Sequence, residues 1–440
     1  MKQITLLAIV ALAGWGCSQA PATGQGEDEP AFRFAPKTMT PLAQFGVENA
    51  RDPRLAVRAA SGSVYLLAVH QLQGLARLGL MRSNDGGDSF SPPTYISAAG
   101  ANVSSHGENS PTFAFGRGRE QYVLFEQRVP GGSTDLMFAR APIGQRWKKP
   151  YKITDKKKPS ANVFSSLAVS PRGSIHAVWL DQRDRAKIPP GTASVYVASS
   201  FDRGKTFGPN VSVAEGVCPC CRPSLSFGPK GEMYVSWRHV FEGNERDIAV
   251  VVSTDRGKTF SETTRVSHDR WKVQGCPHSG AEMAQRGSRL YTTWYSDGDG
   301  KETAAGVRLA YSDDGAKTFS PPVMASQKIL DTNHPRLSLA PDGRLALVFQ
   351  GRDPVKNDGW SPTGAYVVDI AEDGSLSAPV AVPGHTRTVS YPSVAYGSVG
   401  RLFVAWSEEG PDGRTVYFNR ARGDRVPVSK VPVSTTLPIR

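Results

Sequence analysis

The chain has 440 residues, of which 39% are hydrophobic, and its 52 Lys and Arg outweigh 40 Asp and Glu to give a formal net charge of +12. The basic residues are scattered, and the densest run, residues 146–158, falls where an outer strand is expected. A nucleic-acid-binding protein usually concentrates its positive charge on one face or one element. We therefore expect a solvated basic surface and no nucleic-acid partner.

The N-terminus has the pattern of an export signal. Residues 1–16, "MKQITLLAIVALAGWG", carry one lysine before an apolar run too short to span a bilayer. Cys17 follows small residues and resembles the lipidated cysteine of bacterial lipoproteins, with secretion without lipidation as the alternative. Residues 18–35 are mostly small, polar or acidic and predict a flexible linker. We expect an exported lipoprotein in the periplasm or at the cell surface, which meets the membrane only through its lipid anchor.

The rest of the chain is an internal repeat. The segment "RPSLSFGPKGEMYVSW" at residues 222–237 recurs as "HPRLSLAPDGRLALVF" at 334–349 and as "YPSVAYGSVGRLFVAW" at 391–406, and four weaker copies are present. The copies end at positions 67, 125, 179, 237, 294, 349 and 406, which are 54 to 58 residues apart. Seven units of one length indicate a repeat architecture.

Each unit predicts four short strands. In the fourth unit, "EMYVSW" and then "DIAVVVS" at residues 247–253 are short apolar runs bounded by turn residues, and almost no segment has a helical period. Four strands repeated radially favour a β-propeller. We expect an all-β propeller of seven four-stranded blades at residues 36–440, with six blades as the alternative. Either residues 32–45 or residues 427–440 must complete the last blade.

A second motif lies between the third and fourth strands of several units. It reads "SNDGGDSF" from Ser83, "SFDRGKTF" from Ser200, "STDRGKTF" from Ser253 and "SDDGAKTF" from Ser312. The motif resembles the Asp-box, or BNR, repeat of propellers in the sialidase superfamily. We interpret its four aspartates as structural, because a carboxylate in such a turn accepts hydrogen bonds from nearby backbone N–H groups. They are Asp85, Asp202, Asp255 and Asp314.

The loops that lead into each first strand and leave each second strand should meet at one end of the propeller. Neighbouring strands of a blade are antiparallel, so these loops share an end around the central channel. Binding groups favour loops on a rigid scaffold. We expect a glycan or another small molecule to bind at this end of a monomeric protein.

The resemblance to sialidases also implies roles for particular residues. In that family three arginines hold the substrate carboxylate, a tyrosine paired with a glutamate is the nucleophile, and an aspartate is the acid/base. "RDPRL" places Arg51 at the first arginine, and "YPSV" places Tyr391 at the nucleophile, with Glu282 or Glu126 as its partner. Asp181 in "WLDQR" is the nearest Asp-x-Arg, although it lies in the third unit, and the first unit reads "AVHQL" where the family has its aspartate. The remaining substrate-binding candidates are Arg222, Arg238, Arg336 and Arg352.

Four of the five cysteines are outside this enzyme pattern. "VCPCCRPSL" holds Cys218, Cys220 and Cys221, and "GCPHSG" holds Cys276 and His278. An exported protein keeps disulfides, and four cysteines make an even number, so disulfide bonds between neighbouring units are one interpretation. The same thiolates and imidazole suit copper or zinc, which is the second interpretation. Free or redox-active thiols are the third.

Three functions are therefore open. The first is an exo-alpha-sialidase-like propeller that binds, and in its enzymatic form hydrolyses, a terminal acidic sugar. The second is an envelope protein that binds copper or zinc, or has a redox role, through the cysteine cluster. The third is a non-catalytic scaffold for protein interactions, because propellers support many unrelated functions.

Overall fold

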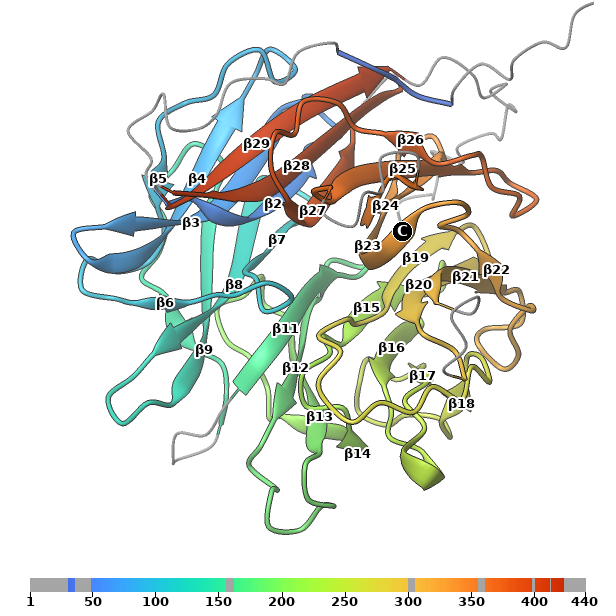
Figure 1. Ribbon diagram of the computed structural model, residues 1–440. Coiled ribbons are helices and arrows are strands. Elements are labelled where there is room, and N and C mark those ends of the chain that lie inside the picture. Colours follow the sequence, from blue (N-terminus) through green and yellow to red (C-terminus); the bar gives the residue numbers. More distant parts are fainter. Residues whose placement is uncertain are drawn as a thin grey trace, which may run out of the picture. The chain divides into compact units, whose positions relative to one another are not determined.

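The computed structural model describes residues 31–35, 49–155, 162–299, 305–354, 361–397, 400–411 and 413–422. These residues belong to one compact unit, Ala31–Arg440. Their regular secondary structure is almost entirely β-strand, in seven antiparallel sheets that follow one another along the chain around a common centre (Figure 1). The fold is an all-β propeller with seven blades, which confirms the predicted architecture over the six-bladed alternative. Helix in the described part is limited to a 3-10 turn, Glu242–Asn244.

The first four blades run from the centre outward in chain order. The first blade consists of β2 (Arg51–Val57), β3 (Val64–Leu72), β4 (Leu75–Ser83) and β5 (Thr94–Tyr95), and the second of β6 (Val103–Ser104), β7 (Thr112–Phe115), β8 (Glu120–Arg128), β9 (Thr134–Pro142) and β10 (Tyr151–Lys152). The third blade consists of β11 (Asn162–Val169), β12 (Ile175–Asp181), β13 (Ala193–Ser200) and β14 (Val211–Val217). The fourth consists of β15 (Ser224–Phe227), β16 (Met233–Arg238), β17 (Ile248–Ser253) and β18 (Thr264–Arg265). In the second blade the inner strand is divided into β6 and β7, both of which pair with β8.

The last three blades have the same order, except that the seventh takes its outer strand from the N-terminal segment. Their strands are β19 (Glu282–Arg286), β20 (Arg289–Ser296), β21 (Gly306–Ser312) and β22 (Val323–Met324); β23 (Leu330–Leu339), β24 (Leu345–Arg352), β25 (Gly364–Ile370) and β26 (Val380–Ala381); β27 (Val389–Tyr396), β28 (Arg401–Gly410), β29 (Gly413–Arg422) and β1 (Arg33–Phe34). The described part of the chain contains no helix long and apolar enough to cross a membrane.

The first strands of the blades form the inner ring. Each contacts the first strand of the next blade, and β27 contacts β2, so the ring is closed. The hydrophobic core lies between neighbouring blades. Trp237 of β16, for example, packs with Val178 and Leu180 of β12 and is fully buried. Six of the seven repeats end in an aromatic residue, which fills the space between two sheets, where its large apolar area contributes most.

Strand β1 completes the seventh blade. It pairs antiparallel with β29, with Arg33 opposite Arg422 and Phe34 opposite Ala421. Phe32 beside it is only 2% exposed and packs into the cluster between the sixth and seventh blades. Of the two segments predicted to complete this blade, the N-terminal one does so, and it lies at the end of the expected linker, residues 18–35. Residues 427–440, Cys17 and the rest of the expected signal and linker lie outside the described residues.

The turns between third and fourth strands are built by their aspartates. In the third blade, Asp202 accepts hydrogen bonds from the Ser200 hydroxyl at 2.9 Å and from the Thr206 hydroxyl and N–H at 2.7 and 3.0 Å. The other three turns have the same arrangement of Ser, Asp and a Ser or Thr four residues later. Hydrogen bonds from the Thr259 hydroxyl and N–H hold the pKa of Asp255 well below its usual value.

Candidate functional site

A cavity of about 240 Å³ lies inside the ring of first strands. All seven blades contribute to its wall, since residues of β2, β7, β11, β19, β23 and β27 line it, together with Leu225 of β15. The apolar part of the wall consists of the side chains of Leu55, Phe113, Leu167, Leu225, Leu337 and Val394. The charged part consists of Arg54, Arg222, Glu282 and Arg336.

Two of these arginines are joined by one carboxylate. Glu282 Oε2 accepts from Arg222 Nη2 at 2.6 Å and from Arg336 Nη1 at 3.0 Å. Arg222 and Arg336 are 4% and 6% exposed, so both guanidinium groups are held in a largely water-free setting. Ion pairs of this kind are short and directional because both partners are charged. Glu282 therefore fixes two guanidinium groups that come from the fourth and sixth blades.

Glu108, in the loop between β6 and β7, joins the same network. Its Oε2 lies 3.2 Å from Arg336 Nη2 and 3.7 Å from Arg222 Nε, and its Oε1 lies 2.7 Å from His334 Nδ1. Burial opposes ionisation of Glu108, but the hydrogen bond from His334 and the nearby guanidinium groups together lower its pKa. Glu108 is therefore a carboxylate at neutral pH, and the network holds two negative charges.

Arg54 is the third arginine at the cavity, and it interacts with the carboxylates of Glu282, Glu108 and Asp52 only at longer range. Its Nη2 donates to the Ser110 hydroxyl at 2.6 Å. Among the residues that the structure describes, it has no carboxylate within the 4.0 Å of an ion pair. Burial and the neighbouring charge of Arg222 lower the pKa of Arg54 to about 10, so it remains protonated at neutral pH. Three guanidinium groups face two carboxylates here, which leaves one positive charge available to an anion.

Tyr391 lies near the start of β27, next to this network. Its ring centroid is 4.3 Å from that of His334, and its N–H donates to Gln350 Oε1 at 3.0 Å. The ring covers Gly107 so closely that a Cβ there would overlap the phenol, and the φ of +57° at Gly107 also favours glycine. Burial, followed by the charges of Glu108 and Asp52, raises the pKa of Tyr391. The phenol is therefore protonated at neutral pH.

The other residues predicted for substrate binding or catalysis are engaged elsewhere. Arg51 lies 3.7 Å from Asp52, and Arg352 donates to Asp331 and to the Ser361 carbonyl. Arg238 donates to the carbonyls of Ser279, Arg246 and Tyr295 and lies over the Trp271 ring. Asp181 is fully buried and accepts from Trp179 Nε1 and from Arg183. None of these four lines the central cavity.

The structure thus brings Arg222, Glu282 and Arg336 together at the cavity, with Tyr391 beside their network. The sequence interpretation missed Arg54 and chose Arg51 three residues earlier. A signal was present, because "DPRLAV" aligns with "HPRLSL", and this places Arg54 at the repeat position of Arg336. Glu108 was identifiable only as one of many polar loop residues.

The cysteine cluster lies in the loops before β15 and β19. Cys218, Cys220 and Cys221 are buried, whereas Cys276 and His278 are exposed. All four of these cysteines are free thiols. The metal-binding atoms form two groups, each within 4.8 Å, that share the Cys220 sulfur: one holds Cys218 and Cys221, and the other holds Cys276 and His278.

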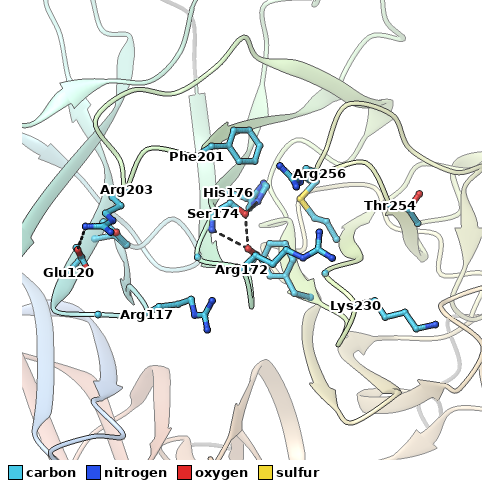
Figure 2. Close-up of a pocket in the computed structure, with 17 residues that line it drawn as sticks. Arg117, Glu120, Arg172, Ser174, His176, Phe201, Arg203, Lys230, Thr254 and Arg256 are labelled. Carbon is cyan, nitrogen blue, oxygen red and sulfur yellow. Dashed lines mark hydrogen bonds and ion pairs between the residues drawn. The ribbon is translucent and has the colours of Figure 1, made fainter. Parts of the chain in front are cut away.

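A larger cleft of about 690 Å³ lies at the opposite end of the strands, between the second, third and fourth blades. Figure 2 shows its five cationic side chains around the opening, and a dashed line joins one of them to the carboxylate of Glu120. These side chains are Arg117, Arg172, Arg203, Lys230 and Arg256. Arg203 Nη1 lies 3.7 Å from Glu120, and in the described part of the chain the other four have no ion pair. This cleft is a basic surface made of long side chains on exposed turns.

No family model matches the chain, and no curated protein matches it. Among solved structures, the chain is similar to the BP39L lectin from Burkholderia pseudomallei, with 15% identity, a TM-score of 0.60 and coverage of 86% of this chain and 98% of the lectin. It is also similar to a protein of unknown function from Dyadobacter fermentans, with 15% identity, a TM-score of 0.51 and coverage of 71% and 93%. Hadza microbial sialidase Hz136 aligns with 13% identity, a TM-score of 0.47 and coverage of 78% and 73%. At these identities, the two matches with TM-scores above 0.5 show a shared fold and nothing further.

Proposed function

We propose that the protein binds a sugar carrying a carboxylate in the central cavity, through Arg54, Arg222 and Arg336. One observation carries this proposal: three guanidinium groups at the cavity face two carboxylates, and Arg54 forms no ion pair among the described residues. A planar guanidinium group matches a carboxylate through two parallel hydrogen bonds. A neutral sugar would leave the positive charge of Arg54 without an anionic partner in the cavity.

The network also supplies preorganisation. Glu282 and Glu108 fix the planes of Arg222 and Arg336 before any ligand arrives. A ligand that meets fixed side chains loses less affinity to the ordering of rotamers. The Ser110 hydroxyl does the same for Arg54. The rigid first strands therefore favour this site over the basic cleft, whose cations lie on exposed turns and are screened by salt.

The volume of the cavity limits the size of the ligand. Pockets for small molecules usually measure about 300–1,000 Å³, and this cavity, at about 240 Å³, is smaller. It has room for one sugar ring rather than for an internal stretch of polysaccharide. The apolar wall formed by Leu55, Leu167 and Leu337 would contact the ring carbons. We therefore propose a terminal acidic sugar as the ligand.

We place hydrolysis second to binding in this proposal. The resemblance to sialidases implies Tyr391 as nucleophile, Glu282 as its partner and Asp181 as acid/base. Glu282 is engaged by two arginines, and Asp181 is engaged by Arg183 and Trp179. A nucleophile needs a base within hydrogen-bond reach. Binding therefore requires fewer changes in the partners of these side chains than catalysis does.

The proposed setting of this function is outside the cytoplasm. Residues 1–16 and Cys17 have the pattern of a lipoprotein signal, and lipidation of Cys17 would tether the propeller to a membrane. A terminal acidic sugar on a glycan would be reachable from that position.

Isothermal titration calorimetry with N-acetylneuraminic acid tests the proposal. We expect Arg336→Gln and Arg54→Gln each to weaken binding by at least about tenfold, because a lost charged hydrogen bond costs about 1.5–3 kcal/mol. Arg172→Gln in the basic cleft is the matched control and should leave binding unchanged. Loss of binding in Arg172→Gln with retention in Arg336→Gln would move the site to the cleft. Release of a fluorogenic aglycone from a sialoside, abolished by Tyr391→Phe, would restore the enzymatic interpretation.

A further inference from the structure

The loop before β15 gathers three thiols at a single point. Cys218 Sγ lies 3.6 Å from Cys220 Sγ and 3.5 Å from Cys221 Sγ, and all three residues are at most 4% exposed. Buried cysteines often pack as small apolar side chains among different neighbours. Here three thiols within four residues face one another instead, in a cluster that also contains Trp237, Leu225 and Phe164.

The spacing of these sulfurs fits a shared metal ion. A disulfide would need about 2.05 Å between two sulfurs. Zinc held by thiolates has Zn–S bonds of about 2.3 Å in a tetrahedron, which places neighbouring sulfurs roughly 3.8 Å apart. The observed separations of 3.5 and 3.6 Å are close to that value. Only a small outward movement of the sulfurs would admit one.

Positive charge lies next to the thiols, as a bound metal–thiolate group requires. Arg246 Nη1 donates to Cys218 Sγ at 3.4 Å. Three thiolates carry more negative charge than one monovalent or divalent ion supplies positive charge, so a buried site needs a cation nearby. Groups in this outer position also orient the ligands and tune their affinity. Arg246 is the residue that we assign to this role.

Two further donors connect the buried thiols to the surface. The Cys276 sulfur and a His278 ring nitrogen lie within 4.8 Å of each other and of the Cys220 sulfur, and both side chains are exposed. Both residues belong to the loop before β19, in the next blade. Cys220 is thus a member of an exposed donor set and of a buried one. A metal ion captured at the surface could pass to the buried set without leaving sulfur coordination.

We propose that Cys218, Cys220 and Cys221 hold one soft metal ion, Cu(I) or Zn(II), which arrives by way of Cys276 and His278. Thiolate sulfur selects these ions over hard cations such as Mg²⁺ and Ca²⁺. Each coordinating thiol releases its proton as the metal binds, so uptake weakens as the pH falls. The site is independent of the sugar-binding proposal, because none of its ligands lines the central cavity.

The test is metal content and thiol reactivity of the full-length protein, purified without chelators. We expect one equivalent of copper or zinc per chain, with elemental analysis deciding between the two. The buried thiols should resist a thiol reagent until a chelator removes the metal. Cys221→Ser should lose the metal, and Cys17→Ser, which removes a thiol outside the cluster, should retain it. Co(II) added to the metal-free protein should give the intense visible bands of a thiolate site.

Cys276→Ser tests the route, because this residue is exposed and its replacement should leave the fold intact. We expect uptake of added Cu(I) or Zn(II) to slow by at least about tenfold. Unchanged uptake would overturn the route. Metal-free protein that binds neither ion would overturn the site, whether its thiols react freely or are paired in disulfides. Whether the metal site exists is decided by the unmodified chain, so this result does not depend on whether a variant folds.

Discussion

Glu126, in β8, is a buried carboxyl group whose ionisation is opposed by the fold. Burial raises its pKa from 4.5 to about 8, and the hydrogen bond from Asn109 Nδ2 at 2.7 Å only partly offsets this. Between these two pH values the folded chain retains a proton that the unfolded chain has released, so stability falls as the pH rises. Between pH 5 and pH 9 we expect the natural protein to lose on the order of 3 kcal/mol of its free energy of unfolding through this group, and we predict that Glu126→Gln abolishes that loss.

Urea unfolding at both pH values measures this difference. Glu262→Gln is the control, because Glu262 is exposed and its replacement should leave the pH profile of the natural protein unchanged. Parallel profiles for Glu126→Gln and the natural protein would show that Glu126 ionises normally in the fold.

His70, in β3, has the opposite pH dependence. Burial lowers its pKa to about 4, and neither ring nitrogen has a hydrogen-bond partner among the described residues. Between about pH 6.5 and pH 4, the unfolded chain binds a proton at His70 and the folded chain does not, so stability falls as the pH drops through this range. We predict that His70→Leu stabilises the protein by roughly 1–3 kcal/mol at pH 5, because two unpaired buried polar atoms are removed.

His176 provides a matched comparison in thermal melts. Its pKa is also lowered to about 4 by burial, but Ser174 and Ser199 lie 2.8 Å from its two ring nitrogens. His176→Leu would remove both of these hydrogen bonds and should lower the melting temperature at neutral pH. The same response from both variants would show that the hydrogen bonds of the ring do not determine the outcome.

The sequence located part of the site through residue type and repeat position. Arg222 lies just before β15 and Arg336 lies within β23, and the repeat placed both at the channel. Arg238 follows Trp237 at a strand end, and the direction of its side chain depends on strand register and on carbonyls from Ser279 and Tyr295. Those carbonyls lie 41 and 57 residues away in the chain. Contacts over such separations could not be read from the local pattern.

At the scale of the element, the turns between third and fourth strands are predicted to be structural. Asp202→Ala removes hydrogen bonds to Ser200 and Thr206 and should destabilise the protein by roughly 1–2 kcal/mol. Binding at the central cavity should not change, because these turns lie at the other end of the strands. Lys205→Ala, in the same turn, is the control. Loss of ligand binding by folded Asp202→Ala would assign these turns a functional role.

Individual strands were predictable where the strand is buried along its length. The runs "EMYVSW" and "DIAVVVS" became β16 and β17 almost residue for residue, because both faces of these strands are covered by neighbouring blades. The divided inner strand of the second blade was not predictable. Its loop carries Glu108 and Gly107, whose positions are set by His334, Arg336 and Tyr391 from distant blades.

At the scale of the molecule, strand β1 makes the propeller depend on its N-terminal segment. Phe32→Ala leaves a cavity between the sixth and seventh blades and should cost about 3 kcal/mol. Phe201→Ala is the control, since Phe201 is 59% exposed and its loss should have little effect. Urea unfolding compares the two. Equal stabilities would mean that β29 holds the last blade without its partner strand.

Seven blades were predictable from the repeat, but the closure of the ring and the charge balance at its centre were not. Both depend on residues that are hundreds of positions apart, such as Glu108 and Arg336, whose separation is 228. The central cavity is therefore a property of the closed ring rather than of any one repeat. Its net positive charge is the basis for the proposed ligand.

The most direct measurement compares N-acetylneuraminic acid with its methyl ester by calorimetry on the natural protein. The two ligands have the same sugar ring, and the ester carries a neutral methyl ester group in place of the negatively charged carboxylate. Our account predicts that the free acid binds and that the ester binds at least about tenfold more weakly, a difference of about 1.4 kcal/mol or more. Equal affinities would mean that the ring is recognised without Arg54, Arg222 and Arg336, and no binding of either ligand would contradict the acidic-sugar proposal altogether.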